Sequence, residues 1–331
     1  MHMADALVSP PVAATAAVAS FAVGGYCVYK LKKENSPEKV PLMGIMGAFV
    51  FAAQMINFSI PGTGSSGHLC GGLLLAALLG PYGAFISMMA ILLLQCLLFA
   101  DGGLMAYGCN CWNMAFYACF FGYYCIYIPI IKKEFSKKRI IAASVLGSIL
   151  SLQLGAFSVV IETLLSGVTK LPFTAFAALM QPIHIAIGAV EGIITAAVLI
   201  FVYNTRPEIL EKGRGEDKFS IKKLIAVFAV ITIVIGGGFS LYASSYPDGL
   251  EWSIENVTGN EELEADDEVY NTMSSIQKKT AVLPDYSFKN YKGDAGTSFS
   301  GIIGSVCVSA VLIAAAYIFK FYRRKDIQNT K

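Results

Sequence analysis

The first two residues, Met1 and His2, could bind a metal ion together with His68. A free amino terminus followed by histidine offers three nitrogens in one plane: the terminal amine, the deprotonated amide nitrogen of residue 2, and the imidazole Nδ1. A second imidazole would close a square, and a square of nitrogens suits Ni²⁺ or Cu²⁺. The chain has three histidines, so only His68 and His184 can supply it. Met-His alone is a weak signal, because many chains begin that way by chance.

The composition is typical of a protein that crosses a membrane several times. Of 331 residues, 55% are hydrophobic and 15% are charged, and the mean hydropathy is +0.60. These values exclude an ordinary soluble domain. A spanning helix needs ~20 mostly apolar residues, and such runs recur along the chain. We therefore predict an all-α polytopic membrane protein with about nine transmembrane helices, over residues 9–31, 41–60, 68–80, 84–100, 104–131, 140–165, 173–203, 224–242 and 299–322.

The amino terminus is predicted to stay on the mature chain. The first cation, Lys30, follows the first apolar run instead of preceding it, which argues against a cleavable signal peptide. The eight cysteines lie in or beside apolar runs. We interpret them as small packing residues, not as a disulfide set.

Positive charges give the expected orientation. Four segments hold 20 of the 25 lysines and arginines: 30–39, 132–139, 204–223 and 320–331. With nine crossings all four fall on one side, which the positive-inside rule makes cytoplasmic. The amino terminus is then outside and the carboxyl terminus is cytoplasmic. The polar stretch 243–298, with a net charge of −7, lies outside. Topology and solubility explain that charge better than an ion-collecting role.

The third predicted crossing, 68–80, is unusually short. Its 13 residues span roughly 20 Å at ~1.5 Å each, against a hydrocarbon layer of ~30 Å. We expect the glycine-rich loop 61–67 to dip into the membrane where protein shields its backbone. A short crossing broken by glycine also indicates a binding site. His68 would then lie below the outer surface, on the same side as Met1 and His2.

Several separated motifs resemble a known family. In chain order they are Met1-His2 with Asp5-Ala6-Leu7 and Ser9-Pro10, His68-Leu-Cys-Gly-Gly through Gly80-Pro81, Asp101-Gly-Gly-Leu104 with Gly108, Asn110, Asn113 and Met114, and Pro182-Ile-His184 with Gly188, Glu191-Gly192 and Thr195. Together, over about residues 1–205, they resemble the substrate-specific M-type (NikM/CbiM) component of energy-coupling-factor nickel/cobalt transporters. Cys109 and Cys111 depart from the family's pattern, in which small or apolar residues are more usual.

The remainder resembles the small N-type partner of that family, because Pro247-Asp248-Gly249-Leu250-Glu251 matches its PDGLE signature. The resemblance implies an M-type domain of seven helices over 1–205 and a basic cytoplasmic linker over 206–223. An N-type domain would follow over 224–331, with two helices flanking the extracytoplasmic loop 243–298.

The resemblance also implies a function, which is the substrate-capture subunit of an ATP-driven importer and not an enzyme. Ni(II) or Co(II) would be the transported substrate, bound outside by Met1, His2 and His68. An all-nitrogen square favours nickel; a cobalt-specific component that serves cobalamin synthesis is the alternative. The expected partners are a membrane coupling (T-type) subunit and two cytoplasmic ABC ATPases, in a prokaryotic plasma membrane. The chain contains no G-x-x-x-x-G-K-[ST] loop for ATP.

Other polar residues are predicted to support the site. His184 is expected to form a structural hydrogen bond or to contact a metal-binding residue, in preference to binding the metal itself. Glu191 must be paired or face the protein interior, because a charge in lipid is costly. The outer loops around the site would be held by Asp101, Asn110 and Asn113. In the N-type loop we expect Asp248, Glu251 and Trp252 to pack against the M-type part. The alternative is that they pass the metal inward.

Two hypotheses from other classes stay open at this point. One is an intramembrane serine hydrolase that uses Ser65 or Ser66 with His184 as base, although no oxyanion or nucleophile-elbow context is evident. The other is a self-sufficient ion permease. It would need a charged pathway, yet the spans contain few acids beyond Glu162 and Glu191.

Overall fold

The computed structural model describes residues 1–34, 39–210, 219–265, 267–289 and 295–329. These residues are mostly helical and include one two-stranded antiparallel sheet. The predicted linker and the predicted outer loop are described only in part, because residues 211–218, 266 and 290–294 lie outside the described ranges. Residues 35–38 of the first basic segment and 330–331 of the last also lie outside them.

Seven segments in the described ranges are long and apolar enough to cross a membrane, and a shorter apolar helix, α2 (Lys39–Gln54), adds to them. The chain is therefore an all-α multi-pass membrane protein, as its composition predicts, while the count of nine crossings stays a prediction. The seven segments are α1 (Pro10–Glu34), α4 with η2 (Pro81–Leu94, Gln95–Phe99), α5 with η3 and α6 (Tyr107–Asn110, Cys111–Tyr127, Ile128–Lys133), α7 (Lys137–Leu165), α8 (Phe173–Thr205), α10 with η4 (Ile221–Gly237, Phe239–Tyr242) and α13 (Ala295–Asn329).

Short elements connect these helices. They are η1 (Asp5–Leu7), β1 (Phe58–Ser59), β2 (Ser66–Gly67), α3 (Gly72–Leu79), α9 (Pro207–Leu210), α11 (Gly249–Thr258), α12 (Glu268–Thr280) and η5 (Pro284–Tyr286). The structure differs from the sequence-based prediction in three segments. The second predicted span ends at Gln54 because the chain turns into the β1–β2 hairpin. Within the fifth, residues Cys111–Tyr127 form a π-helix. The predicted polar loop contains the helices α11 and α12.

The segment predicted as the third crossing is helical only over α3, which begins four residues after His68. Gly71 precedes the helix with φ +82°, in the left-handed region that glycine adopts without a Cβ penalty. Gly80, with φ +80°, ends it, and Pro81 starts α4 at once. His68 therefore lies on a non-helical segment between β2 and α3.

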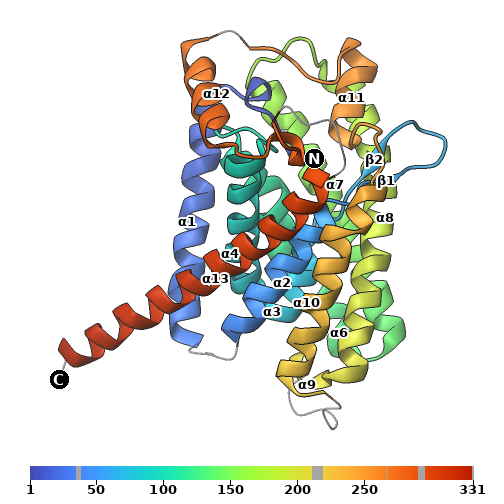
Figure 1. Cartoon of the computed structure of the whole chain (residues 1–331). Coiled ribbons are helices and arrows are strands. Elements are labelled where there is room, and N and C mark those ends of the chain that lie inside the picture. Colours follow the sequence, from blue (N-terminus) through green and yellow to red (C-terminus); the bar gives the residue numbers. More distant parts are fainter. Residues whose placement is uncertain (35–38, 211–218, 266, 290–294, 330–331) are drawn as a thin grey trace.

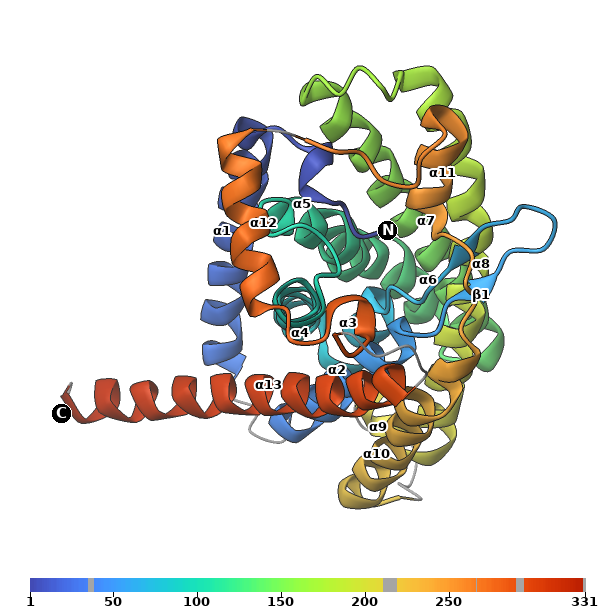
Figure 2. The same ribbon diagram turned by 45° about the horizontal axis from the view of Figure 1, so that its top comes forward.

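Elements from both halves of the chain meet at one end of the bundle. In Figure 1 the amino terminus, the β1–β2 hairpin, α11 and α12 lie towards one end, whereas α6, α9 and the C-terminal end of helix α13 lie towards the other. Helix α13 packs across α2 and continues beyond the bundle (Figure 2). Gly44 and Gly47 of α2 allow this approach, because a Cβ on either would press into side chains of α13. The C-terminal part is thus built into the bundle.

Replacing Gly304 of α13 by alanine should loosen this junction, because the added Cβ would overlap the ring of Phe51. Overpacking of this kind costs on the order of 1–3 kcal/mol, so thermal unfolding in detergent should show a lowered Tm. Gly25→Ala is the matched control, since a Cβ at Gly25 has nothing within 4 Å. A Gly304→Ala protein as stable as wild type would contradict this packing.

Candidate metal centre

The amino terminus is folded into the bundle instead of extending into solvent. Met1 is 7% exposed and Met3 is fully buried. The Met1 amine lies 3.1 Å from Nε2 of His68 and forms an ion pair with the carboxylate of Asp248. The structure thus brings the first residue together with His68 and with a residue from the C-terminal half of the chain.

Asn110 holds the amino-terminal segment in place. The backbone N–H of Met3 donates to Oδ1 of Asn110 at 2.7 Å, and Nδ2 of Asn110 donates to the Met3 carbonyl at 3.1 Å. The N–H of Gly103 donates to the same carbonyl at 2.8 Å. A Cβ at Gly103 would collide with Asp5, so glycine is needed there. The side chain of Asn113 points to the same segment, with Nδ2 3.4 Å from the sulfur of Met3.

His2 lies beside Met1 but its nitrogens have other partners. Nδ1 is 3.0 Å from Oδ1 of Asp101, and Nε2 is 3.2 Å from Oε1 of Gln95. The rings of His2 and His68 stack with their centroids 5.2 Å apart. The other carboxylate oxygen of Asp101 accepts from the hydroxyl of Tyr286 at 2.5 Å. The three predicted ligands are therefore neighbours, while Nδ1 of His2 faces Asp101.

Two glutamines that sequence reasoning missed connect the two histidine segments. Gln95 donates to Oε1 of Gln54 at 2.8 Å, and Gln54 donates to the carbonyl of Cys70 at 2.7 Å. Both glutamines are buried within apolar helices. Their position within apolar runs could have identified them from the sequence, because an amide in an apolar span needs a polar partner inside the protein.

His68 is held in the tautomer that can bind a metal. Its Nδ1 lies 3.1 Å from the carbonyl of Leu69. A carbonyl only accepts, so Nδ1 carries the hydrogen and Nε2 presents a lone pair towards the Met1 amine. Burial, together with the positive charge of the Met1 amine, keeps the pKa of His68 below its ordinary value. The ring is therefore neutral at physiological pH.

Glu191 of α8 fixes the chain immediately after His68. Its carboxylate accepts from the backbone N–H of Cys70 at 2.9 Å and of Gly71 at 3.1 Å. The residue is fully buried, and two backbone donors partly compensate for the loss of water. Glu191 thus faces the protein interior and supports the segment that carries His68.

The Pro247–Glu251 motif forms the start of α11 as a capping box. Oδ1 of Asp248 accepts from the N–H groups of Leu250 and Glu251 at 2.7 and 3.0 Å, and Oε2 of Glu251 accepts from the N–H of Asp248 at 2.9 Å. This reciprocal pattern satisfies the free donors of a helix start. The other oxygen of Asp248, Oδ2, forms the ion pair with the Met1 amine. Gly249 leaves room for His184, which a Cβ would approach at 3.1 Å.

The start of α11 is also attached to the loop before His68. Nε1 of Trp252 donates to the carbonyl of Thr63 at 3.0 Å, and the N–H of Ser66 donates to the carbonyl of Pro247 at 2.8 Å. The hydroxyl groups of Ser65 and Ser66 donate to backbone carbonyls, and His184 is bonded through Nδ1 to the Met180 carbonyl. The described contacts therefore do not pair either serine with His184, as a hydrolase would require.

The Met1–Asp248 ion pair shifts the pKa of both of its members. Burial is the largest single influence on the pKa of the Met1 amine and lowers it. The charge and hydrogen bond of Asp248, together with the charges of Asp101 and Glu251, outweigh burial, so this pKa is raised. Burial is also the largest single influence on Asp248, and it raises that pKa. The charge and hydrogen bond of the Met1 amine, together with His68 and a backbone hydrogen bond, outweigh burial, so the pKa of Asp248 is lowered. The pair therefore stabilises the fold between these two pKa values. Its contribution is lost as the pH rises through the raised pKa of the amine or falls through the lowered pKa of Asp248.

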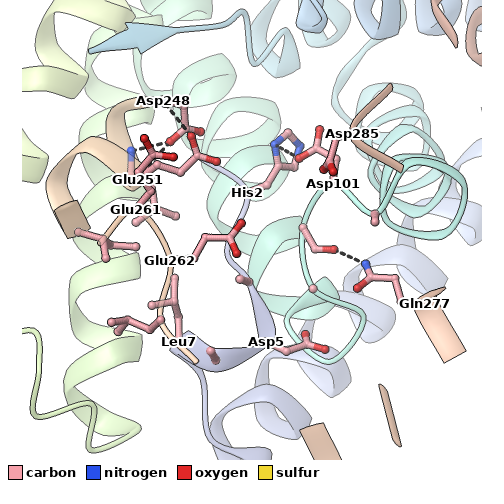
Figure 3. A pocket seen from close by; sticks show the side chains of 18 of the residues that line it. His2, Asp5, Leu7, Asp101, Asp248, Glu251, Glu261, Glu262, Gln277 and Asp285 are labelled. Atoms are coloured by element: carbon pink, nitrogen blue, oxygen red, sulfur yellow. Dashed lines mark hydrogen bonds and ion pairs between the residues drawn. The ribbon is translucent and has the colours of Figure 1, made fainter. Parts of the chain in front are cut away.

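A cavity of about 640 Å³ opens beside these residues, and we call it the vestibule. His2, His68 and Asp248 line it. Figure 3 shows His2 and Asp248 among the side chains around it. No lysine or arginine belongs to the described lining, which includes seven acids: Asp5, Asp101, Asp248, Glu251, Glu261, Glu262 and Asp285. In the described part of the chain, no three His, Cys, Asp or Glu side chains converge as a metal site.

Comparison with known proteins identifies the family of each half of the chain. Residues 2–209 match the family described as the cobalt uptake substrate-specific transmembrane region, and residues 222–321 match the PDGLE domain. A fused nickel transport protein, NikMN, from Archaeoglobus fulgidus is 33% identical over 311 residues, covering 94% of this chain and 96% of that protein. A fused nickel transport protein, LarMN, from Lactiplantibacillus plantarum is 41% identical over 127 residues, which is 38% of each chain.

A solved structure is also similar. The crystal structure of a truncated transition metal transporter aligns with a TM-score of 0.55 and 30% identity, covering 62% of this chain and 99% of that one. The family match covers more than half of the chain, and the PDGLE match follows it in the same polypeptide. The chain belongs to the cobalt uptake substrate-specific transmembrane family, as an M-type component fused to an N-type, PDGLE-containing component.

Proposed function

We propose that this chain is the substrate-capture subunit of an ATP-driven importer of the energy-coupling-factor type for Ni²⁺ or Co²⁺. One observation carries the proposal: the Met1 amine is buried 3.1 Å from the Nε2 lone pair of His68, beside an acidic vestibule. Fused relatives are named as nickel transport proteins and shorter relatives as cobalt transport proteins, which supports a metal-transport component over an enzyme.

In the proposed site four nitrogens bind the cation: the Met1 amine, the His2 amide nitrogen, Nδ1 of His2 and Nε2 of His68. The ring of His2 must turn Nδ1 away from Asp101 to take part. An all-nitrogen square favours Ni²⁺ over Co²⁺, with a cobalt-specific component for cobalamin synthesis as the alternative. The site requires that the mature chain starts at Met1, which the intact mass of the purified protein tests directly.

The proposed topology has nine crossings, with the amino terminus outside and the carboxyl terminus in the cytoplasm of a prokaryotic cell. The grouping of the amino terminus with α11 and α12 at one end, and of α6 and α9 at the other, supports it. We propose an M-type domain over 1–205, a linker over 206–223 and an N-type domain over 224–331. A membrane coupling subunit and two ABC ATPases would drive transport.

The N-type part is proposed to complete the outer wall of the site. Asp248 supplies the charge beside the Met1 amine, Glu251 holds Asp248 through the capping box, and Trp252 ties α11 to the loop before His68. These contacts favour packing over a direct transfer of metal for Glu251 and Trp252.

Inserting one glycine between Met1 and His2 should abolish tight nickel binding, because the amine and the His2 nitrogens can then no longer share one metal plane. Titration of the purified chain with NiCl₂, followed by absorption, should lose the yellow planar Ni(II) band. An extra glycine after Thr169, in the exposed connection between α7 and α8, is the control and should bind as wild type. Retained affinity in the Met1–His2 insertion would argue strongly against the site.

Metal affinity should fall by about a hundredfold for each pH unit below the raised pKa of the Met1 amine. The cation then displaces two protons, one from the amine and one from the His2 amide. The imidazoles add no proton near neutral pH, because burial lowers the pKa of His2 and of His68. Competition titrations with a chelator across the neutral range measure this slope. An affinity independent of pH is the contrary result.

Asn110→Ala should weaken metal binding by about ten- to a hundredfold, the usual effect of losing a group that orients a ligand. The mutation removes both side-chain hydrogen bonds to Met3, so hydrogen–deuterium exchange over residues 1–8 should speed up. Asn256→Ala is the matched control, because that exposed amide bonds only within its own helix. Unchanged exchange and unchanged affinity together would remove the proposed role of Asn110.

A further inference from the structure

His184 has a buried ring nitrogen without a partner in the described structure. Its Nδ1 lies 2.8 Å from the carbonyl of Met180, one turn earlier in α8. Because a carbonyl only accepts, Nδ1 carries the hydrogen and Nε2 has a lone pair. The residue is 1% exposed, and among the described residues nothing donates to Nε2. An unsatisfied acceptor at such a position costs free energy, so its retention calls for a ligand.

The ring of His184 lines a small cavity behind the proposed nickel site, which we call the inner cavity. Its volume is about 10 Å³, close to the space of one water-sized sphere. His68 and Asp248 line this cavity and also line the vestibule. These two residues therefore border both spaces.

The inner cavity carries donors that suit a late first-row divalent cation. Beside His184 it is lined by the thiol-bearing Cys70, by Met114 and by Asp248. The Cys70 thiol donates to the Met114 carbonyl at 3.0 Å, which leaves lone pairs on its sulfur. Imidazole, sulfur and carboxylate together suit nickel and cobalt better than magnesium or calcium. In the described residues no three of the His, Cys, Asp and Glu side chains converge on one point, so this position would bind weakly.

We propose that Nε2 of His184 is an inner ligand that receives the cation from the amino-terminal site during transport. The inference rests on the proposed function, because it takes Met1, His2 and His68 as the first position. His68 borders both spaces, so a cation can exchange its outer ligands for His184 while one imidazole stays close. Weak binding at the second position is what transport requires, since an ion held tightly would not leave.

The first test uses the full-length chain with one glycine inserted between Met1 and His2, titrated with CoCl₂ and followed by visible absorption. With the first site removed, weak binding of cobalt should remain, and adding His184→Asn should weaken it by about tenfold or more. The asparagine amide retains a donor on the side of Met180 while Nε2 is lost. Adding Asn256→Ala instead should change nothing. Absence of residual binding, or residual binding that His184→Asn leaves intact, overturns the inference.

The second test uses His184→Asn in the otherwise unmodified chain. Nickel affinity should stay within about twofold of wild type, while nickel uptake by cells that express the complete transporter falls by about tenfold or more. Uptake at the wild-type rate overturns the inference. A parallel loss of affinity and of Tm also overturns it, because His184 then acts only in packing. A wild-type chain that binds neither metal, or a glycine insertion that leaves affinity unchanged, defeats the proposed function itself.

Discussion

A buried ammonium needs a buried anion, and much of the end of the bundle that holds the amino terminus is arranged around that single pair. Asp248 reaches the Met1 amine because the capping box of α11 fixes its carboxylate, and α11 is in turn tied to the loop before His68. Removing either charge would leave the other desolvated, which is far more costly than losing a surface ion pair. The first residue and the C-terminal half of the chain are therefore one structural unit.

The segments that carry the site are not regular secondary structure, so side chains satisfy their backbone. Asn110 accepts a hydrogen bond from the backbone N–H of Met3, and Glu191 accepts from those of Cys70 and Gly71. Gln54 donates to the carbonyl of Cys70. Buried non-helical backbone is tolerated only where protein or water replaces the missing hydrogen bonds. The polar residues within the apolar helices are thus explained by two short non-helical stretches, one at Met3 and one at Cys70 and Gly71.

The sequence predicts most of the long helices, because each depends on a local apolar run. It also predicts that Met1, His2 and His68 lie close together, as they do in the structure. It does not predict that α3 starts at Gly72, which depends on the left-handed conformation of Gly71 and on Glu191, 120 residues away. Nor does it predict the partner of the Met1 amine, since Asp248 is 247 residues distant. The D-x-x-E spacing of the PDGLE motif did carry a local signal, that of a helix start with a capping box.

Charge balance explains why such a site would select a divalent cation. Without metal the amine contributes one positive charge, which Asp248 neutralises. A divalent cation that takes the amine and the His2 amide displaces one proton from each, so the net charge beside Asp248 stays the same. A monovalent cation in the same place would leave the buried carboxylate of Asp248 without a net positive partner, at a large desolvation cost. Exchange of one divalent ion for two protons therefore keeps the charge beside Asp248 unchanged. Asp248 and Glu251 at the start of α11 need not move to accommodate it.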